Sequence, residues 1–222
     1  ADVAVDDGFV DFDPGRATQV QTHLAAGTHQ HFTAAHPDVE LEIMLSIPYL
    51  DIMPPNADVW IRFGSGKYPG LHARPLTTDP VFAVCSPAYR DAHGPFERPQ
   101  DLSRAALLRC PMEPWRPWLA AAGLDWPEPA RGVWLVDLGM MLAAARAGQG
   151  IALTRRTLAA EWLDEGKLLR VLDIETAGES QYYLCTEISR PPGGAAQAFS
   201  LWLAAVCERA AQWPRASSAK PE

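Results

Sequence analysis

The sequence lacks the features that mark several large protein classes. Its four cysteines form no Cys-x-x-Cys pair, so neither a redox motif nor a zinc ribbon is indicated, and we expect buried free thiols. The histidines lack the spacing of a zinc site. No apolar run reaches the roughly 20 residues of a membrane helix, and the acidic start shows no signal-peptide pattern. We therefore predict no metal, no cofactor and no membrane association.

Positive charge is also scarce. The chain has 19 Lys and Arg against 27 Asp and Glu, which gives a formal net charge of −8. Because DNA binding needs a basic surface that neutralises phosphates, we expect that these residues do not contact DNA themselves. The rest of the composition is that of a globular protein: 48% of the 222 residues are hydrophobic and 21% are charged. This length suits one large domain or two small lobes.

Apolar patterning alternates between strands and helices along the chain. The residues that read as strands are 39–46, 58–62, 71–76, 81–85, 106–109, 133–136, 151–153, 168–172 and 181–186. The helical patterns are 19–36, 115–122, 137–147, 154–163 and 195–212, with Asp137 placed to cap the third. Such alternation predicts parallel sheets with helices on both faces. With about ten strands, two lobes are more natural than one sheet, and Gly64–Leu71 and Ile174–Gln181 are the expected crossings.

No catalytic apparatus is visible, so we expect that the chain is not an enzyme and has no catalytic residues. It has no Gly-x-Ser-x-Gly nucleophile motif, and Gly64-Ser65-Gly66 lacks the lysine of a phosphate loop. The neighbouring carboxylates Asp11 and Asp13 are more typical of a solvated turn than of an acid–base pair. Arg155 and Arg156 follow a strand and are interpreted as a solvated helix face.

Ligand-binding chemistry is better supported. In open α/β sheets, ligands lie outside the carboxyl ends of strands, where helices begin. Three segments offer such ends: 18–21, 62–64 and 137–140. Arg62 is a cation at the end of a buried strand. It either pairs with a neighbouring acid such as Asp58 or holds a ligand carboxylate, for which its guanidinium is suited.

Aromatic residues give two further candidates with open alternatives. Tyr182 and Tyr183 are adjacent on one strand, so they point to opposite faces and only one can face a cleft. Trp115 and Trp118 lie three residues apart on one helix face. They belong either to the core or to the lining of a ligand site.

Six motifs, in their order and spacing over residues 17–207, resemble the effector-binding domain of LysR-type transcriptional regulators. They are His36-Pro-Asp-Val-Glu-Leu41, the run from Ala57 to Gly66, Cys85-Ser-Pro-Ala-Tyr89, Arg98-Pro-Gln-Asp-Leu102, Trp118-Leu-Ala-Ala-Ala-Gly123 and the run from Ala143 to Leu153. The Ile-Arg-Phe-Gly and Trp-x-x-Trp-Leu-x-Ala-Ala-Gly elements look most like the branch that contains the glycine-cleavage activator and β-lactamase regulators.

The resemblance implies an α/β fold of the type II periplasmic-binding-protein kind. Two Rossmann-like lobes, expected at 1–70 with 179–222 and at 71–178, would be joined by two crossing strands. Family members usually carry an N-terminal winged helix-turn-helix, which is absent here, so we expect a piece of a longer cytoplasmic regulator. Its implied partners are a small-molecule effector such as an amino acid or another small metabolite, further copies in a homodimer or tetramer, and promoter DNA through the missing domain. The alternative is a secreted solute-binding protein of the same architecture.

The resemblance also implies which positions line the effector site. They are Thr18, Gln19, Val20, Ser46, Ile47, Arg62, Phe63, Leu138, Gly139 and Tyr182. Family members commonly carry small hydroxyl residues where Gln19, Leu138 and Gly139 stand, and such hydroxyls often hold a carboxylate. Their absence here implies either that the effector is not an ordinary carboxylate or that backbone N–H groups and Arg62 hold its carboxylate instead.

Overall fold

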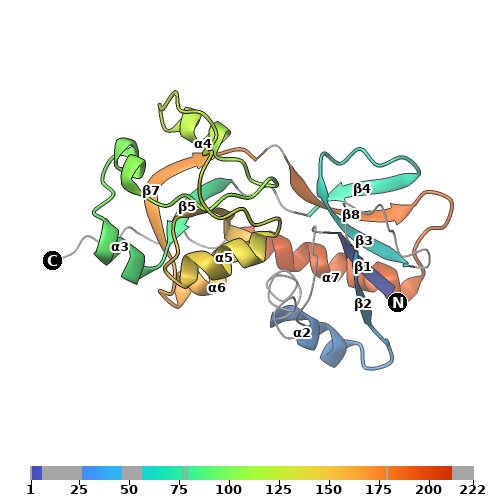
Figure 1. Cartoon of the computed structure of the whole chain (residues 1–222). Helices are drawn as coiled ribbons and strands as arrows, with labels where there is room; N and C mark the ends of the chain where they lie inside the picture. The colour runs from blue at the N-terminus through green and yellow to red at the C-terminus, as the bar shows by residue number, and fades with distance from the viewer. Residues whose placement is uncertain are drawn as a thin grey trace.

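Strands and helices alternate through the parts of the chain that the computed structural model describes, which are residues 2–6, 27–46, 57–76, 78, 80–178 and 180–211. Figure 1 shows the elements in chain order. They are β1 (Asp2–Asp6), α2 (Gly27–Ala35), β2 (Glu42–Ser46), β3 (Val59–Gly64), β4 (Leu71–Pro75), β5 (Val81–Cys85), α3 (Pro87–His93), the 3-10 helix η3 (Pro99–Arg104), α4 (Trp115–Ala121), α5 (Leu138–Arg146), β6 (Ala152–Arg155), α6 (Arg156–Asp164), β7 (Leu169–Thr176), β8 (Gln181–Glu187) and α7 (Gly194–Ala211).

The strands form two sheets. The larger has the order β2-β1-β3-β8-β4, and the smaller has the order β6-β5-β7. Strands β1, β2 and β3 are parallel, whereas β8 runs antiparallel to β3 and β4, and β5 runs antiparallel to β6 and β7. The expectation of purely parallel sheets was therefore wrong, because the strands that return from a crossing enter their sheet in the opposite direction. In Figure 1 the smaller sheet lies with α3 to α6 in one half of the molecule, and the larger lies with α2 and α7 in the other.

Two connections join the sheets. One runs from β4 to β5 and the other from β7 to β8, the second as predicted for Ile174–Gln181. The segment Gly64–Leu71, the other expected crossing, instead connects β3 to β4 within the larger sheet. Its glycines serve the turn: Gly66 has φ +77°, and a Cβ there would lie 2.5 Å from the ring of Tyr183. Strand β4, which the expected division gave to the second lobe, pairs with β8 of the larger sheet.

Most helix boundaries follow the sequence pattern. Asp137 caps α5 as predicted, its Oδ1 accepting a hydrogen bond from the backbone N–H of Met140 at 2.5 Å. Of the helix expected over 19–36, α2 covers 27–35, and residues 19–26 lie outside the described parts. The strand expected at 133–136 is reduced to one bridge between Trp134 and Arg109. Val133 and Trp134 are about half exposed, so this segment lacks the burial that a full strand would gain.

The core has two large parts on opposite faces of β5. Phe82 and Val84 join a cluster that also contains Ile61 and Tyr182 of the larger sheet and residues of α5, α6 and α7. The cluster therefore extends across both sheets. Val81, Ala83 and Cys85 face a second cluster, which α4 covers. This alternation explains why all five residues of β5 are buried.

Trp115 and Trp118 belong to the second cluster and are fully buried. Their rings meet edge to face with centroids 5.6 Å apart. The indole N–H of Trp115 donates to the carbonyl of Leu108 at 2.7 Å, and that of Trp118 donates to the carbonyl of Ile174 at 3.2 Å. Of the two alternatives for this pair, the core is correct. The four cysteines, Cys85, Cys110, Cys185 and Cys207, are likewise buried free thiols, as predicted.

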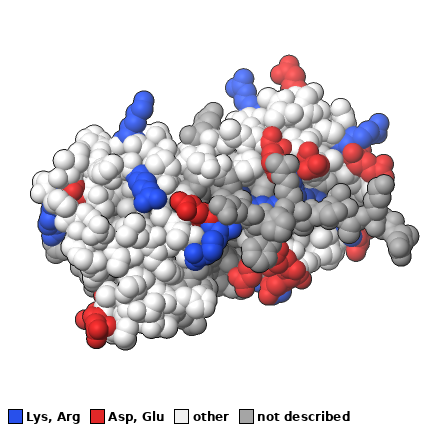
Figure 2. All heavy atoms as spheres, turned by 180° about the vertical axis from the view of Figure 1, so that it is seen from behind, with Lys and Arg blue, Asp and Glu red and all other residues white. Residues whose placement is uncertain are grey.

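Within the described parts, every helix is too short or too polar to cross a membrane. On the face seen in Figure 2, basic and acidic side chains are interspersed.

We expect Trp118→Ala to lower the free energy of unfolding by about 3–5 kcal/mol, because it leaves a cavity under β7 and an unpaired carbonyl at Ile174. Urea unfolding measures this loss. Arg116→Ala, an exposed neighbour on the same helix, is the control and should change the free energy by less than about 0.5 kcal/mol. Similar losses in both variants would contradict the core assignment.

Candidate functional site

Side chains from both sheets meet at the carboxyl end of β3. The ring centroid of Phe63 lies 4.9 Å from that of Tyr182, its register partner on β8. The guanidinium of Arg155, the last residue of β6 in the smaller sheet, lies 5.4 Å from the Phe63 centroid. We call this group the inter-sheet junction and define it as Phe63, Glu113, Arg155, Gln181 and Tyr182.

Arg155 is fully buried and bonded to several parts of the chain. Its Nε donates to Oε1 of Glu113, itself buried, at 2.5 Å. Its Nη1 donates to Oε1 of Gln181 at 3.0 Å, and its Nη2 donates to the carbonyl of Ser180 at 2.6 Å. Because Ser180 and Gln181 form the crossing into β8, this one side chain connects the end of the smaller sheet to the larger sheet.

The sequence interpretation of Arg155 and Arg156 as a solvated helix face was wrong. Arg155 is fully buried, and Arg156 is only 9% exposed. A signal for this was present, because Arg155 directly follows three buried residues of β6. The criterion that selected Arg62, a cation at the end of a buried strand, applies equally to Arg155.

Strand β3 separates two of the predicted site residues. Successive side chains of a strand point to opposite faces. Phe63 therefore packs with Tyr182 against the cluster that spans both sheets. Arg62 points to the other face, where its guanidinium lies 4.2 Å from the ring centroid of Tyr68. Asp58, its suggested partner, lies 3.9 Å from Arg190.

Three of the other predicted site residues lie in the described parts of the chain, and four do not. Leu138 and Gly139 are buried in the first turn of α5, and Leu138 packs in the same cluster as Tyr182. Ser46 ends β2 opposite Asp6 of β1. The remaining positions lie outside the described residues, and these are Thr18, Gln19, Val20 and Ile47.

A second buried carboxylate, that of Asp137, lies near this junction. Asp137 is 1% exposed, and its Oδ2 has no hydrogen-bond partner among the described residues. Burial raises the pKa of this carboxyl from 3.8 to about 7, although backbone N–H groups of Met140 and Gly139 act in the opposite direction. The sequence identified Asp137 only as a helix cap, because nothing in the pattern distinguishes a buried cap from an exposed one.

The buried thiol of Cys110 is influenced by both carboxylates. Burial is the main cause that raises the pKa of its thiol to about 12, and the charges of Asp137 and Glu113 add to it. Cys110 is therefore a neutral thiol near pH 7, unsuited to attack a substrate. Among the described residues, no group of His, Cys, Asp or Glu is arranged to hold a metal ion. The groups that this region offers are a buried ion pair, hydrogen-bonding side chains and aromatic rings.

Comparisons with known proteins agree on one family. The profile of the family described as LysR substrate binding domain matches residues 17–208. The chain is 33% identical over 176 residues to the HTH-type transcriptional activator AmpR of Rhodobacter capsulatus, and 27% identical over 175 residues to the glycine cleavage system transcriptional activator of Escherichia coli K12. Each alignment covers 78% of this chain but only 58% and 57% of the relative. The chain therefore spans little more than half the length of these relatives.

A solved structure supports the same conclusion for the fold. The effector domain of AmpR from Pseudomonas aeruginosa superposes with a TM-score of 0.77 at 26% sequence identity, over 95% of this chain and 97% of that one. The type II periplasmic-binding-protein-like fold expected from the sequence is therefore confirmed.

We expect Gly178→Ala to lower the free energy of unfolding by about 2–4 kcal/mol. A Cβ at this position would lie 1.9 Å from Nη2 and 2.8 Å from Cζ of Arg155, so the guanidinium has to move away from Ser180 and Gln181. Urea unfolding tests this. Gly194→Ala is the control, because a Cβ there meets nothing within 4 Å. Equal midpoints for the two variants would show that the junction tolerates a displaced Arg155.

We expect the stability of the protein relative to Asp137→Asn to fall as pH rises. The folded protein keeps the Asp137 proton up to about pH 7, whereas the unfolded chain releases it near pH 3.8. The unfolding free energy therefore decreases between these values, by an amount on the order of 4 kcal/mol. Asn retains the cap without a charge. Urea unfolding at several pH values from about 4.5 to 8 should show the unfolding free energy of Asp137→Asn rising relative to that of the wild type. A difference between the two proteins that stays constant with pH would contradict the prediction.

Proposed function

Because this chain belongs to the LysR substrate binding domain family, the effector-binding domain of LysR-type regulators, we propose that it binds a small metabolite between two lobes and so controls transcription. The observation that carries the proposal is the inter-sheet junction. It draws residues from both sheets to the place where the crossing segments pass, so a ligand bound there contacts both halves of the molecule. Binding at a topological switch between sheets is common in α/β proteins.

We propose a division into lobes that follows the sheets. Lobe I holds β1 to β4, β8, α2 and α7, and lobe II holds β5 to β7 with α3 to α6. Of the two lobe boundaries expected from the sequence, at 70 and 179, only the first changes. Because β4 pairs with β8, we place the first boundary after Pro75 and keep the second near residue 178.

We propose that the effector site includes nine of the ten positions predicted from the sequence, with Arg155 and Asp137 added. Arg62 is left out, because it points to the opposite face of β3 from Phe63. The support is the convergence of Phe63, Tyr182 and Leu138 on one buried cluster with the Arg155 guanidinium beside it. The ligand would favour one angle between the lobes over another. A shift from 1:99 to 99:1 requires about 5.5 kcal/mol of differential affinity.

The regulatory output is proposed from the relatives. The two relatives described above are transcriptional activators longer than this chain, which supports an N-terminal DNA-binding domain, assembly as a homodimer or tetramer, and a cytoplasmic location. They favour a regulator over a secreted solute-binding protein and give no indication of an enzyme. The acidic charge of −8 fits a domain that leaves DNA contacts to another part of the protein.

Thermal unfolding with fractions of a small-metabolite extract tests the proposal. A fraction that contains the effector at 100 times its Kd should stabilise the folded state by about 2.7 kcal/mol, which corresponds to a rise of roughly 5–10 °C in Tm. Phe63→Ala should shrink this rise, because it removes an aromatic face from the junction. Ile188→Ala, an exposed control, should leave it intact. A rise of equal size in the Phe63 variant would exclude the junction as the binding site.

A further inference from the structure

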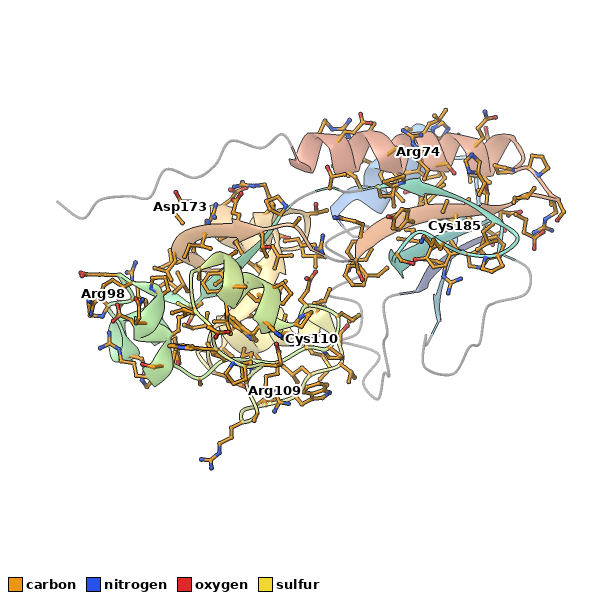
Figure 3. The ribbon with its side chains drawn as sticks, turned by 90° about the horizontal axis from the view of Figure 1, so that it is seen from above. Arg74, Arg98, Arg109, Cys110, Asp173 and Cys185 are labelled. Atoms are coloured by element: carbon orange, nitrogen blue, oxygen red, sulfur yellow. The ribbon has the colours of Figure 1, made fainter. Side chains whose placement is uncertain are left out.

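The junction holds one buried ion pair, between Arg155 and Glu113. Its guanidinium, that of Arg155, is bonded to Glu113, Gln181 and the carbonyl of Ser180. Asp137 is a second buried carboxylate, and its charge and that of Glu113 both raise the pKa of the Cys110 thiol. Figure 3 shows Cys110 on the side of the smaller-sheet half that faces the larger sheet. The carboxylate of Glu113 therefore has a guanidinium partner, whereas that of Asp137 has none among the described residues.

Only one of the two oxygens of the Asp137 carboxylate accepts a hydrogen bond from the described residues. Oδ1 caps α5 by accepting from Met140, whereas Oδ2 is buried and has no hydrogen-bond partner in the part of the chain that the structure describes. Buried polar atoms nearly always have partners, so an exception calls for an explanation. Among the described residues, no lysine or arginine contributes to the pKa of Asp137, since burial and two backbone N–H groups account for it. Oδ2 is thus an acceptor without a donor or a cation.

On the premise of the effector function proposed above, we propose that the effector presents a positively charged nitrogen, such as a protonated amine, to Oδ2 of Asp137. Such a group would supply both the missing donor and the missing positive charge. An effector with only a carboxylate fits this place poorly. Its negative charge would lie beside that of Asp137 in a buried setting.

The competing explanation is that Asp137 is a helix cap and nothing more. Asn and Ser cap helices about as well as Asp, so Asp137→Asn and Asp137→Ser keep the cap and remove only the charge. A purely structural role therefore predicts that these variants bind ligands as the wild type does. Asp125→Asn, at an exposed acid, is the matched control for loss of one negative charge.

Two probes that differ in their charged group test the proposal near pH 8, where Asp137 is ionised. They are propylammonium and propionate, and saturation-transfer NMR titrations measure their affinities. We expect propylammonium to bind the wild type and the Asp125 variant equally. It should bind both Asp137 variants at least about 10-fold more weakly, which corresponds to 1.4 kcal/mol. Propionate should bind the Asp137 variants no more weakly than the wild type.

Two results would overturn this inference. One is an affinity of both Asp137 variants for propylammonium within twofold of the wild-type value, with circular dichroism showing that they are folded. The other is the absence of any propylammonium signal with the wild type. Neither result touches the proposed function, which is decided by whether metabolite fractions stabilise the protein.

Discussion

The buried guanidinium of Arg155 is the interaction on which the arrangement of the two sheets depends. A charge that leaves water is tolerated only where an opposite charge and hydrogen-bond acceptors surround it. Arg155 obtains them from Glu113 in the loop before α4, from Ser180 in the crossing and from Gln181 at the start of β8. These segments lie far apart in the chain and belong to both halves of the molecule. Moving one sheet without the other would leave the charge partly unsatisfied, so the network resists intermediate positions.

Such a network suits a domain that alternates between defined states. The hydrophobic cluster shared by β3, β8, β5, β6 and three helices keeps the halves in contact, while only the two crossings join their backbones covalently. Packed interfaces of this kind move between discrete arrangements and do not deform continuously. A ligand that inserts beside Phe63 and Arg155 would act where a small displacement alters contacts on both sides.

The sequence predicted local features well and non-local ones less well. Asp137 as a cap and the strands at 81–85 and 181–186 are fixed by neighbouring residues, and the structure confirms them. The direction of strands and the site of the first crossing depend on which strand pairs with which, and periodicity does not contain this information. Arg155 was misread for the same reason. Its burial results from Glu113 and Gln181, which are 42 and 26 residues away.

The acidity of the chain acts at two scales. Over the whole surface, a net charge of −8 disfavours contact with phosphates, so in the function that we propose the signal reaches DNA through shape and not through direct contact. Inside the molecule, burial raises the pKa of Asp137, and no cation among the described residues offsets this effect. The ligand-free domain is therefore less stable with Asp137 ionised, which is the form that would bind a cationic ligand. An effector with a positive charge would offset the cost of ionising Asp137 when it binds. Its affinity therefore depends on the same burial that disfavours the ionised carboxylate in the ligand-free domain.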